Sequence, residues 1–131
     1  MQETIKHFNP RDEFFTIEGC YITELLNTPN DPGLSIARAR VAPGVKTRWH
    51  RLSGITERYY IISGQGIMEA GKIPPQEVTA GDIVLIPPLR RQRITNTGSE
   101  DLIFLAICTP RFCNDAYEDI DNRETAKKLS G

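Results

Sequence analysis

Three polar side chains in the middle of the chain have the types and the spacing to share one site. His50 and Leu52 alternate onto one face of an expected strand, Glu57 begins the next strand, and Gln92 begins a later one. If that face points inward, an imidazole, a carboxylate and an amide converge. Such donors can ligate a hard or borderline cation, with water filling the remaining positions. His50, Glu57 and Gln92 are therefore a candidate site for one divalent metal ion: iron, manganese, nickel or zinc.

The same residues also suit acid–base catalysis without a metal. Histidine titrates near neutral pH, and a neighbouring carboxylate can orient it as a general base. Tyr59 is the candidate acid, because strand alternation places Tyr59 rather than Tyr60 on the face of Glu57. A plainer interpretation is that His50 and Gln92 only hold hydrogen bonds in the core. The residues alone leave these alternatives open.

Arginine supplies 11 of the 16 basic side chains, and Arg48 falls on the strand face of His50. Guanidinium groups bind carboxylates and phosphates in bidentate geometry. We therefore predict that Arg48, Leu52 and Gln92 contact the substrate, and an acidic small molecule is one expected ligand. The 17 acidic residues leave a net charge of only −1, which argues against a nucleic-acid partner.

Short strands must position these residues. From residue 34 to about residue 109, β-branched or alternating runs are broken about every 8 to 12 residues by glycine or proline turns, which is typical of an all-β sandwich or barrel. Sequential strands should pair antiparallel. The expected strands are Tyr21–Leu26, Leu34–Val41, Thr47–Leu52, Glu57–Ser63, Gly66–Ala70, Glu77–Thr79, Ile83–Ile86, Gln92–Asn96 and Leu102–Cys108.

Two stretches of this pattern resemble the two motifs of the cupin superfamily. They are carried by Gly44, His50, Glu57 and Gly64, and by Gly81, Pro87 and Asn96. The resemblance implies an antiparallel jelly-roll β-barrel, commonly dimeric. It also implies a site inside the barrel, where two histidines and the glutamate of the first motif and one histidine of the second bind a divalent metal.

The chain departs from the family pattern at three positions. Leu52 replaces the second histidine of the first motif, Gln92 replaces the histidine of the second, and Leu89 replaces a glycine. The resemblance then implies either a weaker, one-histidine metal site or no cofactor. Metal-free members of the superfamily use histidine, tyrosine or acidic side chains for proton transfer or for ligand binding.

The 131 residues fit a single cupin domain, with the motifs at residues 44–64 and 81–96. An N-terminal arm of about residues 1–20 is expected to add an edge strand or to cross a dimer partner. A C-terminal tail of about residues 114–131 is expected to form a short helix or a loose tail. Trp49 alternates away from His50, so it should face outward or into a partner subunit, and we expect a homodimer.

The longest strongly apolar run, residues 102–108, is too short to cross a membrane, and the N-terminal residues lack the apolar stretch of a signal peptide. We expect a cytoplasmic protein with no membrane partner and with reduced cysteines. Cys108 receives no assigned role, because a single bulge would reverse the face on which it lies.

The sequence therefore predicts a small-molecule enzyme of the cupin type, acting through His50 and Glu57 with a weakly held metal or as a metal-free acid–base pair. Isomerase, dehydratase and oxygenase chemistry all remain open. The alternative is a non-catalytic cupin that binds or senses a small metabolite.

Overall fold

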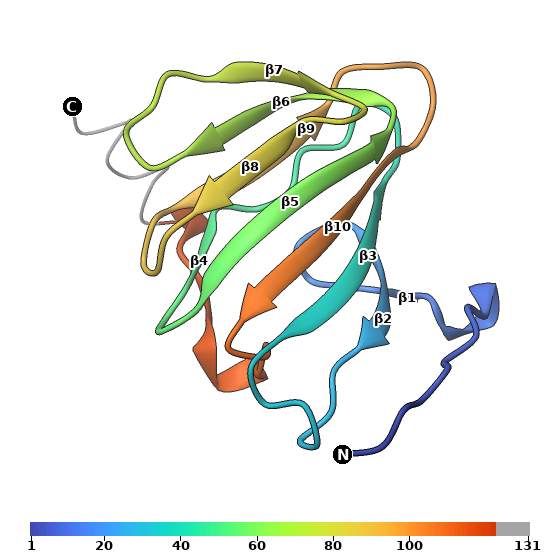
Figure 1. Cartoon of the computed structure of the whole chain (residues 1–131). Helices are drawn as coiled ribbons and strands as arrows, with labels where there is room; N and C mark the ends of the chain where they lie inside the picture. The colour runs from blue at the N-terminus through green and yellow to red at the C-terminus, as the bar shows by residue number, and fades with distance from the viewer. Residues whose placement is uncertain (123–131) are drawn as a thin grey trace.

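Two antiparallel sheets make up the computed structural model, which describes residues 1–122 (Figure 1). One sheet has six strands in the spatial order β1 (Phe14–Phe15), β2 (Tyr21–Leu26), β3 (Ser35–Val41), β10 (Leu102–Thr109), β5 (Thr56–Ser63) and β8 (Ile83–Ile86). The other has five strands in the order β11 (Tyr117–Asp119), β4 (His50–Leu52), β9 (Gln92–Asn96), β6 (Gln65–Ala70) and β7 (Gln76–Thr79). Two short 3-10 helices precede β1 and β11: η1 (Pro10–Asp12) and η2 (Asn114–Ala116).

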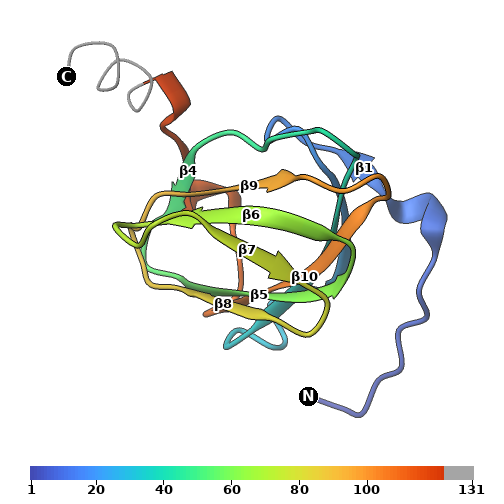
Figure 2. The ribbon, with the colours of Figure 1, turned by 90° about the horizontal axis from the view of Figure 1, so that it is seen from above.

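The two sheets lie face to face as a flattened jelly roll (Figure 2). The predicted all-β jelly-roll class is confirmed. Among the described strands no pairing joins the edges of the two sheets, so hydrogen bonds do not close the barrel. In the described part of the chain, no helix has the length and apolar character needed to span a membrane.

All nine predicted strands are present, with small differences at their ends. β5 shows the physical reason, because Glu57, Tyr59 and Ile61 are buried while Tyr60 and Ile62 are exposed. Period-2 alternation of this kind assigns each side chain to one face of a half-buried strand. The largest difference is in β4, which begins at His50 rather than at Thr47. Thr47 instead bonds to the backbone of Ile94 as the chain approaches the strand.

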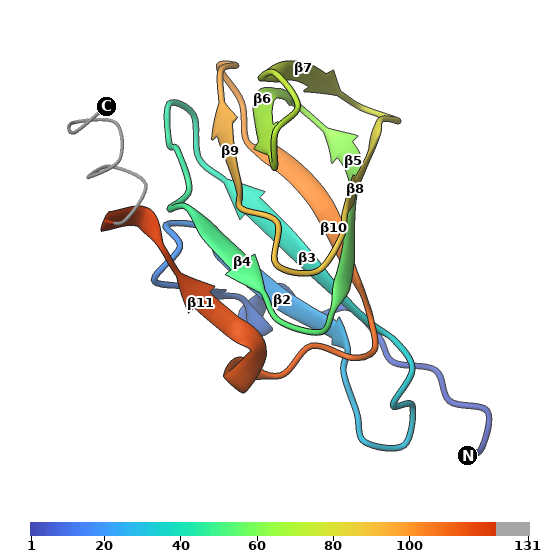
Figure 3. The same ribbon diagram turned by 90° about the vertical axis from the view of Figure 1, so that its left-hand side faces the viewer.

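The C-terminal prediction needs a correction. Within the predicted tail, the described residues form η2 and then strand β11, which pairs with β4 (Figure 3). Tyr117 lies opposite Leu52, and Asp119 lies opposite His50. An unpaired edge of β4 would expose a row of backbone donors and acceptors, and β11 covers that edge. Residues 123–131 lie outside the described residues.

The N-terminal arm packs on its own sheet. β1 pairs with β2, so the edge-strand alternative is the one observed. The Glu13 carboxylate just before β1 forms salt bridges with Arg38 and Arg40 on β3, at 3.4 and 2.7 Å. These contacts hold the arm against the outer face of the six-stranded sheet.

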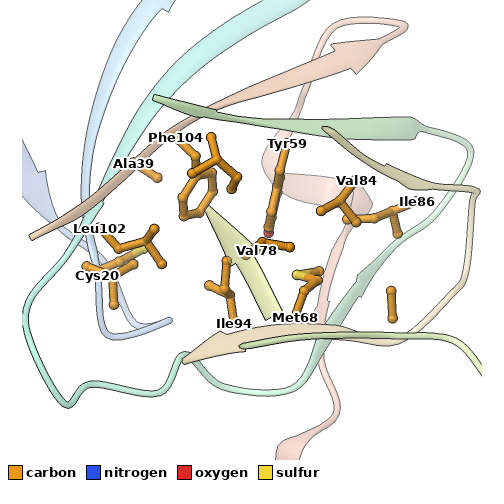
Figure 4. Packing of buried hydrophobic residues seen from close by; sticks show 13 residues of the cluster. Cys20, Ala39, Tyr59, Met68, Val78, Val84, Ile86, Ile94, Leu102 and Phe104 are labelled. Atoms are coloured by element: carbon orange, nitrogen blue, oxygen red, sulfur yellow. The ribbon is translucent and has the colours of Figure 1, made fainter. Parts of the chain in front are cut away.

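The apolar core fills one end of the space between the sheets. Cross-strand neighbours Val41 and Leu102 mark this end and are fully buried. Ile61 belongs to the same buried cluster. Met68 and Ile94 lie between the two sheets as well, and Ile86, which pairs with Glu57, extends the cluster along β8 (Figure 4). At the opposite end of the same strands, Cys108 lies between Ser35 and Glu57, and the space between the sheets is less completely filled there.

Trp49 lies on the outer face of its sheet, with Arg91 and Arg93, as strand alternation predicts, but its side chain is covered there. It is 2% exposed, and the guanidinium groups of Arg91 and Arg93 lie 4.4 and 4.2 Å from its ring centroid. The two arginines therefore cover the indole within the same chain. A cation over an aromatic face is favourable, so Trp49 is no exposed anchor for a partner subunit.

Two motif glycines make a matched test of backbone packing. Gly64 and Gly44 both have positive φ, +87° and +78°, but a Cβ at Gly64 would lie 2.6 Å from the Asp101 carbonyl oxygen, whereas a Cβ at Gly44 would meet nothing within 4 Å. We expect Gly44→Ala to lower the free energy of unfolding by about 1 kcal/mol, from left-handed backbone strain. Gly64→Ala should lower it by at least about 2 kcal/mol more, from the backbone clash. Urea denaturation of both variants measures the difference, and equal losses would contradict the packing argument.

Candidate active site between the two sheets

A cavity of about 370 Å³ lies at the end of the sandwich that the core does not fill. Its walls come from β1, β2, β3, β5 and β10 and from residues around 16–20 and 112–117. Small-molecule sites are typically concave and mostly apolar, with a volume of about 300–1,000 Å³ and a few polar groups. The cavity has the size and character of such a site.

Short side chains create this space. Ser35, Ala37 and Ala39 alternate along the cavity face of β3, and Ala106 on β10 lies opposite Ala37. Larger residues at these positions would bring core packing into the cavity. The short side chains instead form the floor of the cavity, and Phe104 and Tyr59 lie where the cavity meets the core.

Glu57 is the buried acidic group of this cavity. It is 8% exposed, and its Oε1 has no hydrogen-bond partner within the described residues. The Cys108 thiol donates to its Oε2 over 3.7 Å. Burial raises the pKa of Glu57 to about 7, and the nearby Glu18 carboxylate adds to the rise while His50 opposes it. A carboxyl group with this pKa can both donate and accept a proton near neutral pH.

Tyr59 and Gln92 form a buried hydrogen-bonded pair beside Glu57. The Tyr59 hydroxyl donates to Gln92 Oε1 over 2.6 Å. Burial and the Glu57 carboxylate raise the pKa of Tyr59 well above its usual value, so the phenol keeps its proton. Tyr59 lines the cavity, whereas Gln92 is 1% exposed and lies behind the lining residues.

His50 does not line the cavity itself, but it contacts two residues that do. Its Nδ1 lies 2.8 Å from the Arg48 carbonyl oxygen, which can only accept, so this bond assigns a proton to Nδ1. Its Nε2 points toward Glu18 Oε2, 3.7 Å away, and its ring stacks on Tyr117 with 5.4 Å between centroids. Glu18 and Tyr117 both line the cavity, so they connect the imidazole to it.

The predicted metal ligands do not form a set that fits a resident divalent metal. His50 is a single imidazole with Nδ1 engaged by the backbone, and the Gln92 amide oxygen already accepts the Tyr59 proton. Leu52 supplies no donor, and it packs instead with Ile55, Cys108 and Ala116. Within residues 1–122 no group of three or more histidine, cysteine, aspartate or glutamate side chains is placed to hold a metal.

The two other predicted substrate contacts also lie away from the cavity lining. Arg48 is bound to Asp119 over 2.7 Å and lies 3.8 Å from Asp121, so it ties β11 to the start of β4. Leu52 belongs to the small apolar cluster just described. Across the described residues, the charged side chains that line the cavity are all acidic: Glu18, Glu24 and Glu57.

Sequence reasoning missed three lining residues. Glu18 and Tyr117 lie in segments assigned to an arm and a tail, and no local pattern connects either of them to His50. Glu24 could have been found, because its strand was predicted and alternation places it on the face of Ile22, which also lines the cavity. Cys108, to which no role was assigned, lines the cavity as well.

A two-sheet antiparallel jelly roll is the architecture of a class of all-β proteins that includes viral capsid domains, lectins and cupins. The Cupin domain family model matches residues 37–108, more than half of the chain. The chain belongs to the cupin family.

Similarity to individual proteins agrees with this membership. The chain is 33% identical over 110 residues to the uncharacterized protein MJ1618 of Methanocaldococcus jannaschii, covering 82% of this chain and 87% of that protein. It is 38% identical over 72 residues to the oxalate-binding protein of Thermotoga maritima, covering 54% of this chain and 58% of that protein. The solved structure of Pac13, a nucleoside dehydratase from Streptomyces, aligns with a TM-score of 0.73 at 18% identity and covers 90% of this chain and 92% of that one. At this identity the structural likeness shows the fold.

The raised pKa of Glu57 makes a prediction about stability. The folded state holds this proton more tightly than the unfolded state, whose carboxyl has a pKa near 4.5. Stability is therefore greatest below pH 4.5 as far as Glu57 is concerned, and falls as the pH rises from about 4.5 to about 7. Because of Glu57, the free energy of unfolding of the wild-type protein should fall by on the order of 3 kcal/mol between pH 4.5 and pH 8. Glu57→Gln should not show this fall. Urea denaturation at both pH values measures it.

Glu77→Gln is the matched control for this prediction, because Glu77 is an exposed carboxylate on β7. It should keep the wild-type dependence on pH. An unchanged pH dependence in Glu57→Gln would show that the buried carboxyl does not carry the effect.

The donor set predicts a low metal content. Protein purified without added metal or chelator should contain well below one equivalent of iron, manganese, nickel or zinc by elemental mass spectrometry. His50→Ala and Glu57→Ala should show the same content as wild type and as His7→Ala, which changes an exposed histidine. Near-stoichiometric metal that is lost only in the His50 and Glu57 variants would contradict our assessment of the site.

Proposed function

We propose that this cupin is a small-molecule enzyme in which Glu57 transfers a proton to or from a ligand held in the cavity. The observation that carries the proposal is a buried carboxyl with a pKa of about 7 and one unpartnered oxygen, in a cavity large enough for a ligand. General acid–base catalysts work best when their pKa lies near the working pH. Glu57 meets this condition without help from a metal.

Two neighbouring pairs support Glu57. Tyr59 keeps its hydroxyl proton directed at Gln92 and so positions the wall beside the carboxyl. His50 acts through Glu18, whose carboxylate lies between the imidazole and the cavity and provides a second place where a proton can be held. We assign Glu57 the direct catalytic role, and His50, Tyr59 and Gln92 positioning roles.

This arrangement favours isomerisation or dehydration. These reactions need positioned proton donors and acceptors, whereas oxygenase chemistry needs a redox metal with open positions. The donor set around His50 does not fit such a metal. Cupins with similar folds include an enzyme described as a nucleoside dehydratase, which supports proton-transfer chemistry on this scaffold.

A second candidate function is binding or sensing of a small metabolite without turnover. The name of the Thermotoga relative, an oxalate-binding protein, supports this alternative. The lining favours it too, because most of the lining side chains are apolar. The expectation of an acidic ligand rested on arginines, and none of them lines the cavity, so an acid would have to be accepted by protonated carboxyls.

We infer further that the chain forms a homodimer through the outer face of β5 and β8. Four large apolar or aromatic side chains are exposed on these paired strands: Tyr60, Ile62, Ile83 and Leu85. β8 is also an edge strand of its sheet, and exposed edges with apolar neighbours favour association. The cytoplasmic location and the absence of a nucleic-acid partner stay predictions from the sequence.

Turnover distinguishes the two candidate functions. Metabolites that bind the wild-type protein in ligand-observed NMR would be incubated with it, and their conversion followed by mass spectrometry. We expect at least one to be isomerised or dehydrated, and Glu57→Gln to lower the rate by about 10²–10⁴-fold, the usual contribution of a general acid or base.

Glu77→Gln should retain the full rate, since that side chain is exposed and outside the cavity. Binding without conversion by the wild-type protein would instead establish the binding or sensing function. Conversion that is equally fast in Glu57→Gln would remove the catalytic role of this residue.

A further inference from the structure

Three polar atoms at the cavity have no hydrogen-bond partner within the described residues. They are Glu57 Oε1, Glu24 Oε2 and the Tyr117 hydroxyl oxygen, and all three residues line the cavity. Leaving a buried polar group unpaired typically costs about 1–3 kcal/mol. Native proteins rarely tolerate several such groups together, so each needs a partner that residues 1–122 do not supply.

The two carboxyl groups lie on opposite sides of the cavity floor. Glu24 on β2 pairs with Ala37 on β3, and Ala37 pairs with Ala106 on β10. On the far side of β10, Cys108 pairs with Glu57 on β5. Glu24 and Glu57 are therefore three strands apart and offset by two residues along the strands, about 16 Å between backbones. Both residues line the same cavity, on either side of a floor of small residues.

The charge of the lining restricts the ligand. Glu18, Glu24 and Glu57 are its charged groups among the described residues. Lys6 and Arg111 are the basic residues that act on Glu24, but Lys6 donates to the Glu24 carbonyl oxygen, Arg111 donates to Asn27, and neither lines the cavity. Other arginines are paired with surface carboxylates: Arg38 and Arg40 with Glu13, and Arg48 with Asp119. An anion in this cavity would meet like charges in a poorly solvated space and find no cationic partner on the wall.

From these contacts we infer that the ligand is an uncharged or positively charged molecule with hydroxyl or amine donors at both ends. One end donates to Glu57 Oε1 and the other to Glu24 Oε2, with the Tyr117 hydroxyl as a further partner and the middle of the molecule on Ala37 and Ala106. This inference deepens the proposed function by naming a ligand class, and it rests on the same cavity.

Three probes with the same four-carbon chain test the inference: 1,4-diaminobutane, 1,4-butanediol and butanedioate. Their dissociation constants would be measured at pH 7.5 from chemical-shift changes of the backbone amides. We expect the diamine and the diol to shift amides of β2 and β5, and to bind at least tenfold more tightly than the dianion. Butanedioate binding as tightly as either of them, or no shift with any probe up to 50 mM, would overturn the inference.

Two variants locate the contacts. Glu24→Gln should raise the dissociation constant of the diamine about tenfold, as expected for loss of a charge-assisted hydrogen bond. Tyr117→Phe should weaken binding of the diol and leave the urea midpoint unchanged, because the hydroxyl has no partner among residues 1–122 while the ring stays stacked on His50. Glu77→Gln controls for attraction of the diamine to surface carboxylates. Unchanged binding in both Glu24→Gln and Tyr117→Phe would overturn the inference.

These measurements need no turnover, so they fail independently of the proposed function. If the protein binds the diamine and the diol selectively but catalyses no reaction, the inferred ligand class is supported and the proposed enzymatic function is wrong. If catalysis depends on Glu57 but the substrate is an anionic metabolite, the proposed enzymatic function is supported and the inferred ligand class is wrong.

Discussion

The burial of the Glu57 carboxyl between the two sheets is the constraint around which the site is arranged. Removing a carboxylate from water disfavours its charged form, and that desolvation raises the pKa of Glu57 to about 7. The surrounding polar groups relieve this burial only in part. Cys108 donates to one oxygen, and the other oxygen is buried with no hydrogen-bond partner among residues 1–122. Burying this carboxyl therefore lowers folding stability once the pH rises above about 4.5, a cost that functional sites often carry.

The distribution of side-chain size decides where the cavity lies. Bulky residues fill the end of the sandwich at Val41, Leu102 and Ile61, whereas Ser35, Ala37 and Ala106 leave the other end open. The strands are continuous across both ends, so one pair of sheets provides a rigid core and a cavity. The β11 strand completes the open end, because it carries Tyr117 against the ring of His50.

Membership of the cupin family accounts for the fold and leaves the chemistry to the particular side chains. Where the family pattern has metal-binding histidines, this chain uses Leu52 for packing and Gln92 as the acceptor of the Tyr59 proton. Glu57 keeps its position in the motif, but no second imidazole stands beside it to complete a metal-binding set among the described residues. In the function we propose, the scaffold is retained while the polar groups of the pocket serve proton transfer and ligand binding.

Local pattern was sufficient for most of the strands and for the shared face of Glu57 and Tyr59, because alternation with period two is a property of the strand itself. The turns followed from glycine and proline for the same local reason. What covers each face was decided only by the tertiary structure. Arg91 and Arg93 cover Trp49. Arg48 pairs with Asp119 rather than lining the pocket. Glu18 and Tyr117, near opposite ends of the chain, both contact His50. The residues next to a side chain in the sequence predict which face of the strand it occupies. Contacts between segments about 30 to 100 residues apart depend instead on how the sheets pack, and local alternation carries no information about that packing.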